Sequence, residues 1–339
     1  MVGRRQESRE EKMPKIVVLS PLPQEAVQGM LTGVTDRSDV VVEVYGGEPG
    51  HGLEEAVRGA DVIIGDFTFR LPIDAAVAEA ARGCRLIQQP SIGYQHIDLE
   101  ATRRAGIPVA NVGAANAIGV AEQAIMFMLC LLKRALYFHA KTARGEWGQQ
   151  DVFTLGMYEL HGKTLGIIGM GNIGREVALR ARAFGCRTLY YDTRRLPEEK
   201  ERELGAEYAA LEELLRGSDI VSLHVPLTPE TRHLIDRERL TMMKPEAHLL
   251  NLARGEVVDE EALAEVLQEG RLAGAGIDVF SEEPVNPDNP LLRSDKVILS
   301  PHVAGGTNES RVRMLQVTVD NVVRVLSGEK PRFVVNGVE

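Results

Sequence analysis

The stretch "KTLGIIGMGNIGREVALRARAFGCRTLYYD" (163–192) decides the fold of this chain. A β-branched run leads into three glycines with the spacing G-x-G-x-x-G, at Gly169, Gly171 and Gly174, and a helical pattern follows them. The first glycine permits a tight turn, the second lets a pyrophosphate approach the backbone, and the third lets the helix lie close on the strand. Asp192 ends the next strand-like run, where a carboxylate can accept hydrogen bonds from an adenosine ribose. The stretch therefore predicts a dinucleotide-binding βαβ unit.

The acidic residue also predicts which dinucleotide is bound. A carboxylate at Asp192 would repel a 2′-phosphate, so we expect NAD rather than NADP. Arg194 and Arg195 follow after Thr193 and could soften that preference. The helix after the glycines should turn one face to the sheet, and we expect that face to consist of Ile173, Val177, Ala181 and Phe184.

Short β-branched runs alternate with helical patterns on both sides of this unit, which indicates an α/β fold with parallel sheets. Before it, we expect strands within residues 15–20, 40–46, 61–67, 84–90 and 107–111. From Lys163 onward, we expect strands within 163–169, 187–192, 219–225, 247–253, 274–280 and 296–302. A helical stretch of high apolar content, from about Gly119 to Trp147, should pack between domains or against a second subunit. The helical tail after Asn308 is too short to be a domain and should return to the first one.

Composition narrows the class of protein. A net charge of −10 without a basic stretch argues against a nucleic-acid or anionic-membrane partner. The most apolar segment, "AIMFMLCLL" (124–132), is shorter than the roughly 20 residues that span a bilayer. Cys84, Cys130 and Cys186 match neither a disulfide framework nor a zinc spacing, so we expect no metal and a cytoplasmic location. Residues 1–13 are charged and lack the apolar core of a signal peptide, so we expect a disordered extension.

Charged side chains follow the ends of three neighbouring predicted strands. Arg254 comes after residues 247–253, Asp278 lies in 274–280 with Glu283 just beyond it, and His302 ends 296–302 within "LSPHVAGG" (299–306). Ligands bind outside the carboxyl ends of the strands in open α/β sheets, so these side chains should meet where the nicotinamide lies. Taken singly, each is more often a surface charge or a packed histidine. Together they suit reduction of a 2-keto acid, because histidine can protonate the carbonyl oxygen, a carboxylate can orient the histidine, and arginine can bind the substrate carboxylate.

The chain resembles the D-isomer-specific 2-hydroxyacid dehydrogenase family over about residues 15–330. The motifs that carry the resemblance are "GKTLGIIGMGNIGREVA" (162–178), "HVPLTPETRHLI" (224–235), "LNLARGEVVDEEAL" (250–263), "AGAGIDVFSEEP" (273–284) and "LSPHVAGG". The resemblance implies a flavodoxin-like substrate domain, formed by residues 14–113 and 308–339, and a Rossmann NAD-binding domain, formed by residues 114–307. It places the active site in a cleft between the two domains and implies a homodimer.

The resemblance also assigns site residues. It makes Arg254, Glu283 and His302 the catalytic residues, and it has the backbone amides at Ile92 and Gly93 bind the substrate carboxylate together with Arg254. The implied cofactor contacts are Gly169, Gly171, Asn172, Ile173, Gly174, Asp192, Val225, Pro226, Leu252, Ala253, Asp278, His302 and Ala304. The family usually reads Val-Ala-Glu-His in the linking helix, whereas Gln123 stands here in the histidine position, and we expect little effect on mechanism.

Several functions remain open at this point. The leading one is NAD(H)-dependent reduction of a small 2-keto acid, such as glyoxylate or hydroxypyruvate, to the D-2-hydroxy acid. A D-3-phosphoglycerate dehydrogenase is an alternative, although the turn "QQPSIGYQ" (88–95) is uncharged and Arg70 is the only nearby arginine. Phe67, Phe69 and Leu71 would suit a pocket for a larger keto acid, or simply core packing. Formate-oxidising relatives carry glutamine in place of Glu283 and are set aside. A non-enzymatic NAD-sensing protein, similar to the C-terminal-binding-protein corepressors, is an alternative from another class.

Overall fold

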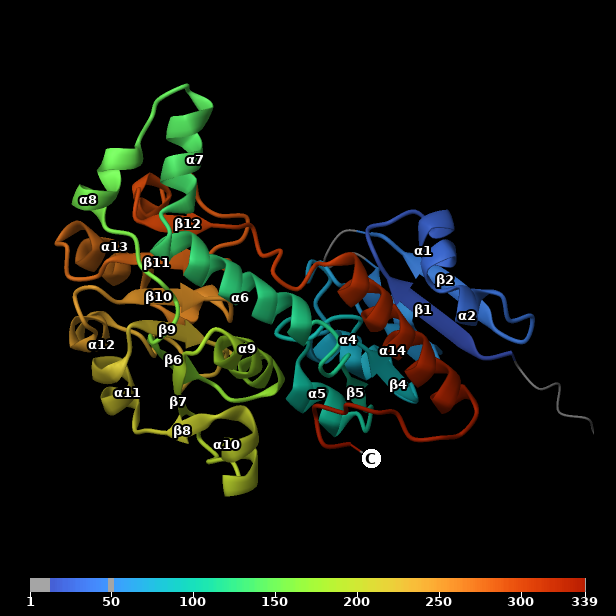
Figure 1. Cartoon of the computed structure of the whole chain (residues 1–339). Coiled ribbons are helices and arrows are strands. Elements are labelled where there is room, and N and C mark those ends of the chain that lie inside the picture. Colours follow the sequence, from blue (N-terminus) through green and yellow to red (C-terminus); the bar gives the residue numbers. More distant parts are fainter. Residues whose placement is uncertain (1–12, 48–51, 339) are drawn as a thin grey trace, which may run out of the picture. The chain divides into compact units, whose positions relative to one another are not determined.

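The computed structural model describes residues 13–47 and 52–338, which form two compact units (Figure 1). Unit 1 is Met1–Ala115 with Asn308–Glu339, and unit 2 is Asn116–Thr307. The first division falls two residues after the boundary expected at 114. Ala115 belongs to unit 1 because Arg313 in the C-terminal helix donates a hydrogen bond of 2.8 Å to its backbone oxygen. The expected disordered extension lies outside the described residues, apart from Met13.

Unit 1 is built on a five-stranded parallel sheet with the order β2-β1-β3-β4-β5. This is the flavodoxin-like strand order. Each strand falls inside a segment that the sequence predicts: β1 (Lys15–Leu19), β2 (Val41–Tyr45), β3 (Val62–Ile64), β4 (Leu86–Gln88) and β5 (Val109–Ala110).

Helices cover both faces of the unit 1 sheet because alternate residues of its strands are apolar on either side. Val17 and Leu19 of β1 face α3 and α4, whereas Ile16 and Val18 face α1 and the C-terminal helix α14. The predicted return of the tail to the first unit is confirmed by the packing of α14 on β4 (Figure 1). The helices of unit 1 are α1 (Gln24–Met30), α2 (Thr32–Thr35), α3 (Leu53–Val57), α4 (Ala75–Ala80), α5 (Leu99–Arg104) and α14 (Asn308–Leu326).

Unit 2 contains a seven-stranded parallel sheet with the order β12-β11-β10-β9-β6-β7-β8. This is the Rossmann strand order with one strand added. All strands remain parallel, but the order in which the chain adds them changes side between β6 and β9, which is the topological switch point. The strands are β6 (Thr164–Ile168), β7 (Arg187–Tyr191), β8 (Ala206–Tyr208), β9 (Ile220–Leu223), β10 (His248–Asn251), β11 (Gly274–Ile277) and β12 (Val297–Leu299). The sequence did not predict β8, because "AEY" is too short and too polar to give a strand pattern.

The predicted helix from about 119 to 147 is wrong as a single element. It is two helices, α6 (Ala117–Leu132) and α7 (Ala135–Ala143), separated where Arg134 adopts a left-handed backbone with φ of 51°. α6 packs on α9 and on β10 and β11, whereas no residue of α7 is buried. The other helices of unit 2 are η1 (Gln149–Asp151), α8 (Val152–Leu155), α9 (Asn172–Ala183), α10 (Glu198–Leu204), α11 (Leu211–Gly217), α12 (Arg237–Met242), η2 (Gly255–Val257), α13 (Glu260–Gln268) and η3 (Pro290–Arg293).

The predicted sheet-facing side of α9 is partly right. Val177 and Ala181 are buried, and Gly174 and Ala178 join them. Phe184 is 41% exposed, because α9 ends at Ala183 and Phe184 caps it outside the helical repeat. Nowhere in residues 13–47 and 52–338 is there a helix with the length and apolarity needed to cross a membrane.

Asn321 is the polar residue that fixes α14 in unit 1, and it generates a stability prediction. Its buried amide donates to Gln88 Oε1 (2.7 Å) and to the Arg332 carbonyl (3.0 Å), and accepts from the Arg332 amide (2.8 Å). Asn321→Ala leaves these buried groups without partners and should lower the free energy of unfolding by about 2–4 kcal/mol. Urea unfolding followed by circular dichroism measures this loss.

Gln316→Ala is the matched control, because it removes an exposed amide from the same helix. It should change the free energy of unfolding by less than about 0.5 kcal/mol. Equal losses in the two variants would contradict the role given to Asn321.

Candidate active site

The glycine turn after β6 has the geometry that a pyrophosphate requires. Gly169 has φ of +96°, and a Cβ there would lie 2.6 Å from the His224 carbonyl oxygen. A Cβ at Gly174 would lie 2.2 Å from the Gly169 oxygen, so α9 can pack this closely only with glycine. At Gly171 a Cβ would meet nothing within 4 Å, so the space outside the turn is open. The first turn of α9 has no side-chain cap, and its amides are therefore available to an anion.

Asp192 lies directly after β7 and supports the same turn. Its Oδ2 accepts a hydrogen bond of 2.7 Å from the Met170 amide, and its Oδ1 accepts one of 3.1 Å from the Arg194 amide. The remaining predicted cofactor residues of unit 2 follow the carboxyl ends of other strands. Val225 and Pro226 come after β9, Leu252 and Ala253 after β10, and Asp278 after β11. These residues and an open glycine turn form a set that fits a dinucleotide.

Arg254, Glu283 and His302 emerge from three adjacent strands of the unit 2 sheet, β10, β11 and β12. His302 Nδ1 lies 2.7 Å from Glu283 Oε2, and both side chains are about one-third exposed, at 35% and 38%. Arg254 is half-buried, and its Nη1 donates to the Ala253 carbonyl oxygen at 2.6 Å. The structure thus brings together the histidine and carboxylate that the sequence separates by nineteen positions.

Glu283 is held in its ionised form. Burial opposes ionisation, but hydrogen bonds from His302 and the Phe280 amide, with the charge of Arg254, outweigh burial and keep the pKa of Glu283 below its ordinary value. The Phe280 amide donates to Glu283 Oε1 at 3.0 Å, which leaves Oε2 for the histidine. A charged carboxylate on Nδ1 favours the imidazolium and fixes the ring orientation.

Asp278 holds the loop that carries His302. Asp278 is buried, with 1% of the residue exposed. Its carboxylate accepts hydrogen bonds from the amides of Val303 (3.0 Å) and Ala304 (3.1 Å) and from the Ser300 hydroxyl. The His302 amide donates to the Asp278 carbonyl at 2.7 Å. His302 has φ of 54°, a left-handed conformation that a residue with a Cβ adopts only when its surroundings impose it. These bonds impose it.

Two further residues act through this loop or border the cofactor turn, and the sequence analysis gave neither of them a role in the site. Gln123 of α6 donates to Ser300 Oγ at 3.3 Å, so it connects through Ser300 to Asp278. His224 follows β9, its Nε2 lies 2.8 Å from Ser222 Oγ, and burial lowers its pKa to about 3. The sequence pattern around Gln123 and His224 did not predict these contacts, because each contact depends on which segments become neighbours in the folded sheet.

The predicted substrate turn belongs to unit 1. Asn111 Nδ2 donates to the Ile92 carbonyl at 3.1 Å, and Ser91 Oγ donates to the Gly93 carbonyl at 3.2 Å. In the part of the chain that the structure describes, the backbone N–H groups of Ile92 and Gly93 have no protein acceptor. Such amides can receive an anion.

The apolar residues near this turn do not act as a group. Leu71 is in the core, at 3% exposed, and the Phe69 ring packs against the His96 ring in a tilted arrangement, with ring centres 5.0 Å apart. Phe67 alone is well exposed, at 45%. Arg70 is exposed, and its amide donates to Asp66 Oδ2 at 2.9 Å. The prediction of a large apolar pocket therefore loses two of its three residues to packing.

Comparisons with known proteins agree with this geometry. Residues 125–304 match the model of the D-isomer specific 2-hydroxyacid dehydrogenase NAD binding domain. A glyoxylate reductase of Korarchaeum cryptofilum is 43% identical over 83% of this chain and 84% of its own length. A glyoxylate reductase of Aeropyrum pernix is 40% identical over 96% of both chains. The crystal structure of D-lactate dehydrogenase from Aquifex aeolicus, complexed with NAD and lactic acid, is 33% identical with a TM-score of 0.81 and covers 92% of this chain and 96% of its own.

These similarities extend over both units and confirm the predicted α/β fold and its NAD(H) cofactor. They also favour an enzyme over a non-enzymatic NAD-sensing protein, because the relatives are reductases and dehydrogenases. The chain belongs to the D-isomer-specific 2-hydroxyacid dehydrogenase family and is an NAD-dependent 2-hydroxyacid dehydrogenase, which reduces 2-keto acids.

Proposed function

We propose that this enzyme reduces glyoxylate and hydroxypyruvate, with His302 as the proton donor. The observation that carries the proposal is the 2.7 Å contact between His302 Nδ1 and Glu283 Oε2, at the sheet edge where Arg254 also emerges. Bound nicotinamide supplies the hydride that goes to C2 of the keto acid. The protein's own side chains supply the proton and the positive charge.

His302 has one ring nitrogen left for chemistry. Because Nδ1 is engaged by Glu283, Nε2 carries the proton that passes to the carbonyl oxygen of the substrate. Ionised Glu283 accepts the hydrogen bond at Nδ1 and stabilises positive charge on the ring before the transfer. The bonds from Asp278 to residues 303 and 304 hold this histidine in place throughout.

Arg254 provides a local positive charge for an anionic substrate in a protein whose net charge is −10. Its guanidinium binds the keto-acid carboxylate and polarises the carbonyl, with a fork geometry that lysine does not offer. The free amides of Ile92 and Gly93 bind the same carboxylate. A small keto acid needs no further recognition group.

The choice of glyoxylate and hydroxypyruvate rests on the two archaeal relatives named glyoxylate reductase and on an uncharged substrate turn. Steady-state oxidation of NADH tests it with glyoxylate, hydroxypyruvate, pyruvate, phenylpyruvate and 3-phosphohydroxypyruvate. We expect the highest kcat/KM with glyoxylate or hydroxypyruvate. A preference of tenfold or more for the phosphorylated acid would favour the phosphoglycerate alternative, and a preference for phenylpyruvate would overturn the small-substrate proposal.

We also propose a cytoplasmic homodimer. The cytoplasmic location is supported by three free cysteines. One of them, Cys84, is buried, and burial raises its pKa to about 12. Recovery of the protein from a secreted fraction would contradict this location. The dimer is supported by apolar side chains that residues 135–155 leave exposed, at Leu136, Tyr137, Trp147 (82%) and Phe153 (89%).

Sedimentation equilibrium checks the dimer. We expect a mass of twice 37.2 kDa for the natural chain and a shift toward monomer for Phe153→Glu. A natural chain that sediments as a monomer at micromolar concentration would contradict the proposal.

His302→Gln should lower kcat by about 100- to 10,000-fold, the usual contribution of a positioned acid. The Kd for NADH should change less than about threefold, because the glycine turn and Asp192 are untouched. Turnover assays and NADH titration measure the two quantities. His161→Gln, an exposed histidine of the same unit, is the control and should leave both unchanged. Retention of most of the activity by His302→Gln would refute the acid role.

Glu283→Gln should move the alkaline fall of keto-acid reduction to lower pH, because the neutral amide no longer stabilises a positive ring. Reduction needs the proton on His302, and the ionised carboxylate stabilises the positive ring that carries it. Because the pKa of Glu283 is lowered, its effect is present at neutral pH and disappears only below that pKa. Profiles of kcat/KM from pH 5 to 10 measure the shift. With the neighbouring exposed Glu282→Gln as control, identical profiles for all three proteins would exclude the proposed coupling.

A further inference from the structure

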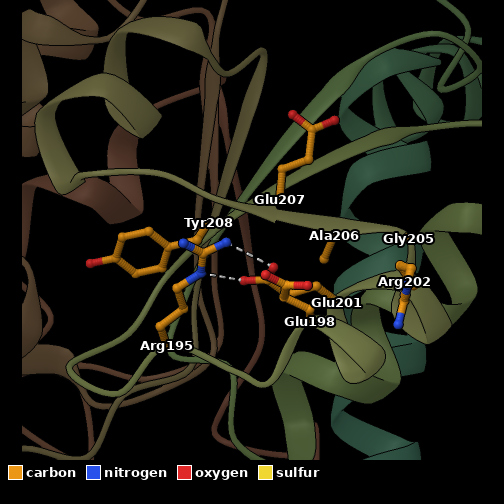
Figure 2. Close-up of a pocket in the computed structure, with 8 residues that line it drawn as sticks. All are labelled: Arg195, Glu198, Glu201, Arg202, Gly205, Ala206, Glu207 and Tyr208. Atoms are coloured by element: carbon orange, nitrogen blue, oxygen red, sulfur yellow. Dashed lines mark hydrogen bonds and ion pairs between the residues drawn. The ribbon is translucent and has the colours of Figure 1, made fainter.

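The loop, helix and strand after Asp192 enclose a shallow hollow of about 530 Å³ at the edge of the unit 2 sheet (Figure 2). They are residues 193–197, α10 and β8. Arg194 and Arg195 both lie in this loop, two and three residues after the carboxylate assigned to the ribose. Either cation is close enough in the chain to favour a 2′-phosphate, so their partners bear on the choice between NAD and NADP.

Arg195 is paired with Glu201 through two hydrogen bonds. Its Nε donates to Glu201 Oε1 at 2.9 Å, and its Nη2 donates to Glu201 Oε2 at 3.0 Å, as the dashed lines in Figure 2 indicate. Its guanidinium carbon also lies 5.6 Å from the centre of the Tyr208 ring. This two-bond pairing with a stacked aromatic ring holds the arginine more firmly than a single surface ion pair would. By contrast, no hydrogen-bond or ion-pair partner of the Arg194 side chain lies within residues 13–47 and 52–338.

Glu201 is held from its other side. Its carboxylate accepts a hydrogen bond of 2.7 Å from the hydroxyl of Tyr190, a fully buried residue of β7, and that hydroxyl accepts one of 2.8 Å from the Leu196 amide. The Glu201 side chain is only 12% exposed. Bonds from Arg195 and Tyr190 outweigh burial and lower its pKa, so the carboxylate is ionised at neutral pH. Glu201 of α10 is therefore a hydrogen-bond acceptor held in a fixed position beside β7.

We propose that Glu201 determines cofactor specificity by holding Arg195 against Tyr208 and so withholding it from the 2′-phosphate of NADP. Asp192 repels that phosphate, and Glu201 removes one of the two cations that would compensate. The preference for NAD(H) thus depends on a residue of α10 that needs no contact with the cofactor. Glu201 is a positioning residue, and its effect on the cofactor passes through Arg195.

Glu201→Gln tests the proposal by direct binding. Glutamine keeps the shape but loses the charge, so Arg195 is released. Titrations that follow the fluorescence of the reduced nicotinamide should give a Kd for NADPH about tenfold lower than in the natural chain, the scale of one charge-assisted hydrogen bond to phosphate. The Kd for NADH should stay within about threefold. These measurements need no keto acid, so they are independent of the proposed substrate.

Two further variants separate the mechanism from a general change in charge. Glu198→Gln removes the same charge from the same helix and the same hollow, but Glu198 makes no hydrogen bond to Arg195. It should leave the Kd for NADPH within about threefold of the natural value. In the double variant Arg195→Ala/Glu201→Gln the gain should disappear. An unchanged Kd for NADPH in Glu201→Gln, an equal gain in Glu198→Gln, or a gain that persists in the double variant would each overturn the proposal.

Discussion

Parallel pairing of β10, β11 and β12 is the constraint on which the active site depends. Because the three strands run in one direction, their carboxyl ends lie at one edge of the sheet and deliver Arg254, Glu283 and His302 there. No single loop carries the three residues. The three side chains therefore come together only when the unit 2 sheet is complete, so the proposed catalysis depends on the stability of the whole unit.

A second layer of interactions gives this set its precision. The buried Asp278 binds the residues on both sides of His302 and imposes the left-handed backbone that turns the histidine toward Glu283. Gln123 reaches the same carboxylate through Ser300. The same design recurs at the cofactor end, where Asp192 supports the glycine turn and the Tyr190 hydroxyl supports Glu201. In both places a polar group fixes a neighbouring segment through hydrogen bonds: Asp278 fixes the His302 loop, and the Tyr190 hydroxyl fixes Glu201.

Local patterns predicted most of the fold, because strands of buried parallel sheets are short apolar runs and the glycine spacing is tied to one function. They failed where tertiary structure overrides the pattern. Arg134 breaks a continuous helical pattern by its backbone conformation, and the polar strand β8 forms only because β7 supplies a partner. The meeting of His302 and Glu283 was predicted from the strand ends and again from family resemblance, whereas Arg195 could not be assigned to Glu201 from sequence. That pairing depends on how α10 folds back beside β7.

The central claim is that His302, oriented by Glu283, protonates the carbonyl oxygen of a keto acid held by Arg254. A crystal structure of the enzyme with NADH and oxamate, a stable analogue of glyoxylate, tests it most directly. The account predicts His302 Nε2 within about 3 Å of the oxamate carbonyl oxygen, with the Arg254 guanidinium on the same ligand. Oxamate bound with its carbonyl oxygen beyond hydrogen-bond reach of His302, or against another acid, would contradict it.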